Sequence, residues 1–170
     1  MWAALAITYE DRNMKKILAS IILAVMLMAS NLWAAGSCTE TVASYTGGIV
    51  QIKLVCTGDS GGGSFPTQTI STNAMALIKG THYFYRAKAY PTSGGTAPDA
   101  ADVTVNMDGQ DLLGGKGVNL IHATATYDTF PYSGFMSQYC YPAVTNTITV
   151  AVANQETNSA NYTIELEFVR

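Results

Sequence analysis

The side chains that could carry catalysis are few and widely spaced. Ser60 lies in the glycine-rich string Gly-Asp-Ser-Gly-Gly at residues 58–62, and both histidines of the chain, His82 and His122, follow it. A nucleophilic serine needs a histidine as its base and a buried aspartate that orients the histidine. Glycine also adopts the backbone conformations that tight turns require. We therefore expect a glycine turn at this position and no catalytic residues.

The same string resembles the one around the nucleophile of trypsin-like serine proteases. In that family the histidine and the aspartate precede the serine, whereas both histidines here come after it. The chain has no counterpart of the family's Ala-Ala-His-Cys motif, and the part after residue 36 is too short for two β-barrels. We predict that the protein is not an enzyme.

Residue sets that could hold a metal or a cofactor are also sparse. Residues 106–111 read Asn-Met-Asp-Gly-Gln-Asp and are rich in oxygen ligands. A calcium-binding EF-hand needs glycine at its sixth position and a bidentate glutamate at its twelfth, and this segment has neither. The sequence contains no CxxC, HExxH or CxxCH string. We predict a hairpin turn at 106–111, with no metal and no cofactor bound.

Aromatic residues gather between residues 127 and 142. Their ring faces can stack on the apolar faces of sugars or pack among themselves within loops. We select four of them as ligand contacts: Tyr127, Tyr132, Tyr139 and Tyr141. Packing within the core and loops is the favoured interpretation of this segment, and a glycan site is the alternative. A formal net charge of −3 argues against nucleic acid.

The first 36 residues have the pattern of an export signal. Met-Lys-Lys at 14–16 precedes an apolar run at 17–28, and small residues follow at 34–37. This order is typical of a secretory signal peptide. The run is shorter than the roughly 20 residues of a spanning helix, so we predict no membrane span in the mature chain. Cleavage after Gly36 would start the mature chain at Ser37, in the periplasm, at the cell surface or in the medium.

Three cysteines follow this segment: Cys38, Cys56 and Cys140. Residues 39–56 alternate like two strands around a central glycine turn, which brings Cys38 opposite Cys56. Opposed residues of antiparallel strands lie close enough for a disulfide, and export makes oxidation plausible. This bridge would leave Cys140 free. If Cys38 were instead acylated as a lipoprotein cysteine, Cys56 and Cys140 would be the pair.

Residues 37–170 read as one all-β domain. They are rich in Thr, Tyr, Val, Gly and Asn, and no apolar stripe with helical spacing runs for a useful length. Short strands at this spacing predict a single antiparallel β-sandwich of about seven to nine strands. Beyond residue 56 we expect strands at 64–71, paired with 49–57 as a second hairpin, and at 81–90, 102–107, 110–113, 118–125, 147–153 and 162–169.

Alternation also predicts which side chains face the core. In the strand at 81–90, Tyr83, Tyr85, Ala87 and Ala89 should share one face, and His82, Phe84, Arg86 and Lys88 the other. In the last strand, Tyr162, Ile164, Leu166 and Phe168 should share the core face. Glu165 and Glu167 should then face water.

The loop, strand and turn between Tyr90 and Leu120 carry a resemblance to a known group. The residues concerned are the loop at 94–99, the strand at 102–107, the turn at 108–111, Leu-Leu-Gly-Gly at 112–115 and Gly-Val-Asn-Leu at 117–120. They resemble small all-β proteins encoded among phage structural genes, and the likeness extends more loosely to the glycine loop after Cys56 and to a final hairpin between 147 and 168. The resemblance implies a virion-associated or other structural module without catalytic residues. A signal peptide departs from this pattern, and an exported relative of the same fold would fit both facts.

Together these features predict an exported, non-catalytic structural or surface-interaction subunit that binds a protein partner or a second copy of itself. An edge strand is the contact surface that we expect, because its unpaired N–H and C=O groups accept another strand. Two alternatives stay open. One is a fimbrial or pilin-like subunit completed by a donated strand, and the other is a carbohydrate-binding module that uses the aromatic residues between 127 and 141.

Overall fold

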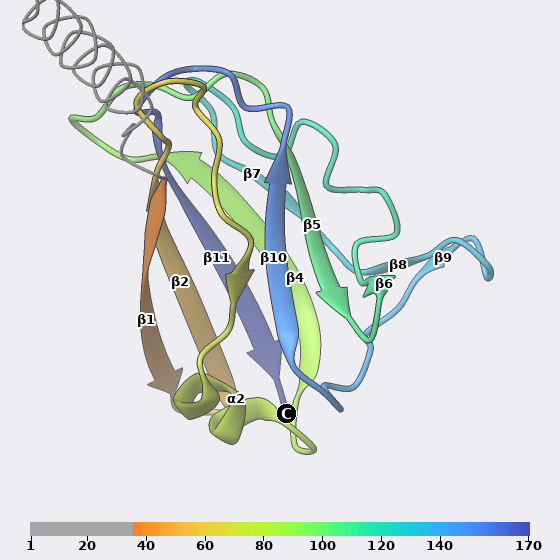
Figure 1. Ribbon diagram of the computed structural model, residues 1–170. Helices are drawn as coiled ribbons and strands as arrows, with labels where there is room; N and C mark the ends of the chain where they lie inside the picture. The colour runs from red at the N-terminus through yellow and green to blue at the C-terminus, as the bar shows by residue number, and fades with distance from the viewer. Residues whose placement is uncertain (1–35) are drawn as a thin grey trace, which may run out of the picture. The chain divides into compact units, whose positions relative to one another are not determined.

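The computed structural model describes residues 36–170, and the predicted signal peptide lies outside them. Eleven strands and one short helix form this part of the chain. Nine of the strands make two antiparallel sheets that face each other (Figure 1). The predicted all-β sandwich is confirmed. Among residues 36–170, no helix has the length and apolar character needed to cross a membrane.

The larger sheet has five strands in the order β1-β2-β11-β4-β7. They are β1 (Ser37–Tyr45), β2 (Ile49–Thr57), β11 (Asn161–Val169), β4 (Tyr83–Pro91) and β7 (Tyr127–Thr129). β1 and β2 form the hairpin predicted from the glycine turn. β11 pairs with β2 on one side and with β4 on the other, so the last strand of the chain joins the two halves of this sheet.

The smaller sheet has four strands in the order β3-β10-β5-β6. They are β3 (Gln68–Thr69), β10 (Ile148–Ala153), β5 (Asp102–Met107) and β6 (Gln110–Asp111). Two predicted pairings are wrong. The segment predicted to pair with β2 contains β3, which pairs instead with β10, because β11 occupies the side of β2 that a second hairpin would need. The predicted final hairpin is also not formed, since β10 and β11 lie in different sheets. Alternation indicates which face of a strand is buried, but it does not determine which other strand pairs with it.

Apolar side chains from both sheets fill the space between them. On β11, Tyr162, Ile164, Leu166 and Phe168 are buried, as predicted. Glu165 and Glu167 lie on the outer face of the sheet, where Lys53, Lys88 and Arg86 pair with them. The outer face is therefore charged but locally neutralised.

The inward face of β4 changes part-way along the strand. Phe84 is buried together with Ala87 and Ala89, although alternation assigns it to the opposite face. The register between β4 and β11 shifts between Glu167 and Phe168. A β-bulge adds one residue to one strand and so reverses the alternation beyond it. The prediction of faces for 81–90 is therefore wrong at its beginning.

A helix, α2 (Thr72–Ile78), lies where the sequence predicts none. Seven residues are too few for a helical apolar stripe to stand out, and tertiary packing supplies the stability of so short a helix. Ser71 caps it by accepting a hydrogen bond from the Ala74 N–H. Ala74, Met75 and Ile78 are buried against the sheets.

The strand predicted at 118–125 is also wrong. These residues form turns, with one isolated bridge between Ala101 and Ile121. Asn119 adopts a left-handed backbone conformation, with φ of 53°, and its N–H donates to the carboxylate of Asp102. This bond to a residue 17 positions earlier holds the chain in a turn at Asn119.

Candidate interaction surfaces

The loop that contains Ser60 is held by the carboxylate of Asp59. It accepts hydrogen bonds from the N–H groups of Gly61 and Gly62, at 2.8 and 2.5 Å, and from the backbone and hydroxyl of Ser64. The Ser64 hydroxyl, followed by these N–H groups, lowers the pKa of Asp59 to about 2. The segment forms a turn, as predicted. Asp59 thus orders the turn, which is a different role from orienting a catalytic histidine.

The two histidines lie in different surroundings. His82 is buried, and its Nδ1 is 2.8 Å from the Thr81 hydroxyl. Burial, with a smaller effect of the Arg170 charge, lowers the pKa of His82. His122 accepts a hydrogen bond from the Thr124 N–H and packs edge-on against the ring of Tyr127. Within residues 36–170, no three or more His, Cys, Asp or Glu side chains gather where they could hold a metal ion.

The oxygen-rich segment 106–111 forms the predicted hairpin turn between β5 and β6. Asp108 and Gly109 have φ values of 53° and 76°, the left-handed conformations that a tight hairpin turn requires. The carboxylate of Asp111 accepts hydrogen bonds from three backbone N–H groups, those of Val105, Leu113 and Gly115. This carboxylate is engaged in stabilising the turn.

A disulfide joins Cys38 of β1 to Cys56 of β2, with their Cα atoms 4.0 Å apart. The predicted pairing is confirmed. The alternative pair of Cys56 with Cys140, which acylation of Cys38 would need, is not formed. Cys140 is a free, half-buried thiol.

A hairpin of aromatic residues projects beyond the sandwich on the side of β5 and β6 (Figure 1). We call residues 130–141 the aromatic arm. It contains β8 (Tyr132–Ser133) and β9 (Gln138–Tyr139), which pair only with each other among the described residues. The rings of Tyr132 and Tyr139 meet edge to face across the two strands, with centroids 5.5 Å apart.

The base of the aromatic arm is anchored to the sandwich. The Tyr132 N–H donates to the Leu112 carbonyl, and the Lys116 ammonium lies 4.6 Å from the centre of the Tyr132 ring. Gly114 has φ of 55° and passes so close that an added Cβ would lie 2.2 Å from the Tyr132 carbonyl oxygen. Only glycine fits there. The arm is therefore held at a fixed place.

The tip of the arm is apolar and open to solvent. Phe135 is 101% exposed and Met136 is 54% exposed. The turn is closed by the Met136 N–H, which donates to the Ser133 hydroxyl. No Asp, Glu, Lys or Arg occurs from Thr129 to Gln155. Burial of a surface without charged groups avoids the large desolvation free energy that a charge would cost.

The structure brings three of the four selected tyrosines together. Tyr132 and Tyr139 face each other in the arm, and Tyr141 stacks on Tyr85 of β4 at 5.4 Å. Phe130 bridges the groups, because its ring contacts both Tyr85 and Tyr139. Sequence reasoning did not select Phe130, Tyr85 or Phe135.

Tyr127, the fourth selected residue, lies apart from the arm. It lines a groove of about 330 Å³ beside β7, together with His122, Lys116, Asp128 and Asn119. The groove combines an aromatic ring with both donors and acceptors of hydrogen bonds. This composition suits a polar ligand such as a sugar.

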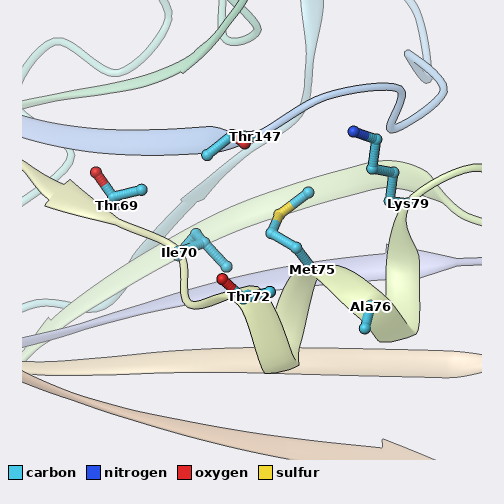
Figure 2. Close-up of a pocket in the computed structure, with 7 residues that line it drawn as sticks. All are labelled: Thr69, Ile70, Thr72, Met75, Ala76, Lys79 and Thr147. Atoms are coloured by element: carbon cyan, nitrogen blue, oxygen red, sulfur yellow. The ribbon is translucent and has the colours of Figure 1, made fainter.

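A second groove, of about 520 Å³, lies between α2 and the segment that enters β10 (Figure 2). Met75 reaches into it from α2, toward Thr147. Lys79 is the one charged residue that lines it, beside threonine hydroxyls and the side chain of Ile70. The lining offers no carboxylate or histidine to act with the lysine as an acid–base pair.

The edges of the two sheets differ greatly in length. β3 and β6 have two residues each and β7 has three, whereas β1 has nine. In the part of the chain that the structure describes, β1 pairs only with β2. Its pairing is continuous from Ser37 to Tyr45, with no bulge, and it contains neither proline nor lysine. Of the common features that protect an edge, β1 therefore has only one charged side chain, that of Glu40.

Comparison of the chain with protein-family models, curated proteins and solved structures gave no match. The aromatic arm and the β1 edge are thus the features on which a role can be argued.

Proposed function

We propose that this protein is an exported structural or surface-interaction subunit that has no catalytic activity and acts by contact through the aromatic arm. The observation that carries the proposal is Phe135, whose side chain is fully in solvent at the tip of an anchored hairpin. Aromatic residues that enter a partner's pocket provide much of the energy of protein interfaces. An exposed Phe on a fixed support is suited to that role.

The arm also limits the cost of binding. Its base is fixed by Leu112, Lys116 and Gly114, so little conformational entropy is lost when the tip is buried. Tyr132 and Tyr139, behind the tip, combine an apolar ring with a hydroxyl that can bond at the wetter rim of an interface. The arm thus has an apolar centre and a polar border.

The disulfide supports an exported location. Disulfides persist in oxidising compartments and are rare in the cytosol. Together with the signal-like sequence of residues 1–36, the Cys38–Cys56 bridge favours a protein that is secreted, periplasmic or on the cell surface. The resemblance to small phage structural proteins implies the same kind of non-catalytic module and stays a prediction.

Photo-crosslinking in the cells that make the protein tests this role. A benzophenone amino acid replaces Phe135 in the full chain, and a matched control replaces Leu77, an exposed apolar residue of α2. We expect ultraviolet light to join position 135 to another macromolecule and to leave position 77 largely unreacted. Equal adducts at both positions, or none at position 135 in any cell fraction, would contradict the proposal.

A glycan-binding role is the second candidate, and the Tyr127 groove is the observation that favours it. Glycan-array binding that is lost on Tyr127→Ala would support this role. If binding is lost on Tyr132→Ala and Tyr139→Ala instead, the aromatic arm is the sugar site. An empty array would leave the contact role as the better account.

A further inference from the structure

We propose that β1 pairs with β1 of a second copy of this chain, antiparallel, about a two-fold axis that passes through Thr41. The two five-stranded sheets would then form one continuous sheet. This inference rests on the β1 edge alone and does not depend on the aromatic arm.

The first argument is the supply of unpaired backbone groups. A free edge strand presents a row of N–H and C=O groups that another strand can bind. Antiparallel neighbours alternate between hydrogen-bonded pairs, with Cα atoms about 5.5 Å apart, and non-hydrogen-bonded pairs, about 4.5 Å apart. The 4.0 Å between the Cα atoms of Cys38 and Cys56 marks a non-hydrogen-bonded pair. Cys38, Glu40, Val42 and Ser44 therefore direct their N–H and C=O groups away from β2.

The second argument concerns register. Opposed residues of two antiparallel strands point to the same face of a sheet, so a two-fold axis within β1 must pass through a residue and not between two residues. Pairing of all nine residues places the axis at Thr41, the middle of the strand. An axis at Glu40 would set two carboxylates directly opposite each other, which destabilises a sheet.

The third argument is that this register is compatible with the side chains. Thr41 would face Thr41 of the second copy, and threonine pairs across strands are favourable. Glu40 would face Val42, which is 37% exposed and would become covered. The Glu40 carboxylate is already held by the N–H and hydroxyl of Ser71, and Lys53 on the next strand lies near Glu165. No like charges lie directly opposite each other at the proposed joint.

A cysteine at the axis tests the register. In a non-hydrogen-bonded pair, as Thr41 would be, two cysteines lie close enough for a disulfide. We expect full-length Thr41→Cys, in a Cys140→Ser background, to form a covalent dimer that reductant dissolves. Thr39→Cys in the same background should form none, since Thr39 would face Ala43. The double change Thr39→Cys with Ala43→Cys should restore the cross-link.

Sedimentation of the uncross-linked protein provides a second measurement. Thr41→Lys places two ammonium groups opposite each other and should turn the dimer into a monomer, whereas Thr41→Val should leave the dimer intact. Three results would overturn the proposal: a monomeric parent protein at high concentration, a dimer that Thr41→Lys does not dissociate, or covalent dimers from Thr39→Cys but not from Thr41→Cys.

Discussion

The two edge strands of the five-stranded sheet, β7 and β1, differ in how far they expose unpaired backbone groups to another strand. β7, at one end, has three residues and carries Asp128, whose carboxylate lies 3.4 Å from Arg86 of β4. β1, at the other end, has nine residues, regular pairing and a disulfide to β2. Short and charged edges discourage the addition of a strand, and long regular edges invite it. The comparison indicates that β1 is regular and available for pairing with another strand, whereas β7 is too short and charged to accept one.

Removal of the disulfide should have the largest effect. The bridge joins residues 18 positions apart, and its removal by Cys38→Ser with Cys56→Ser should lower the free energy of unfolding by about 3 kcal/mol. Urea unfolding of the oxidised parent and the double variant measures this difference. Cys140→Ser is the control and should leave stability nearly unchanged. A loss well below 1 kcal/mol would mean that the bridge does not stabilise the β1 end.

Removal of the charge at the β7 end should have a smaller effect. Arg86 donates to Glu167 at 2.7 Å and lies beside Asp128, and its side chain is one-third exposed. Such pairs contribute little once solvent screens them, so Arg86→Met should lower stability by about 0.5–1 kcal/mol. The difference from the parent should shrink in 1 M salt. A loss as large as that of the disulfide would contradict the proposed contrast between the two ends.

Acid should loosen the turn at 59–64 and have the smallest effect of the three. The pKa of Asp59 is about 2 in the folded protein, below its ordinary value of 3.8. The carboxylate therefore stabilises the turn above pH 4, and this contribution is lost as the pH falls from about 4 toward 2. NMR should show the Asp59 carboxyl titrating near pH 2 and the amide signals of Gly61 and Gly62 shifting with it. Titration near pH 4 would show that these hydrogen bonds are not maintained in solution.

Sequence patterns predicted the fold where short-range physics decides it. The glycine turn after Tyr45 fixed the β1–β2 register, and with it the disulfide. The strict alternation of β11 identified its core face. In both cases the signal lies within about twenty consecutive residues.

The remaining features depend on contacts between distant segments. The position of β11 between β2 and β4, the bulge beside Phe84 and the short helix α2 all result from packing that no local pattern encodes. The same holds for the surfaces. Sequence reasoning selected Tyr132 and Tyr139, but the exposure of Phe135 becomes visible only once the arm is placed outside the sandwich.

Amide hydrogen exchange along β1, at high and low protein concentration, tests the central contrast most directly. The N–H groups of Thr39, Thr41 and Ala43 point to β2 and should be protected at both concentrations. The N–H groups of Glu40, Val42 and Ser44 point outward and should be protected only at high concentration, when a second copy covers them. If these three exchange rapidly at every concentration, the β1 edge is not a contact surface between copies of this chain.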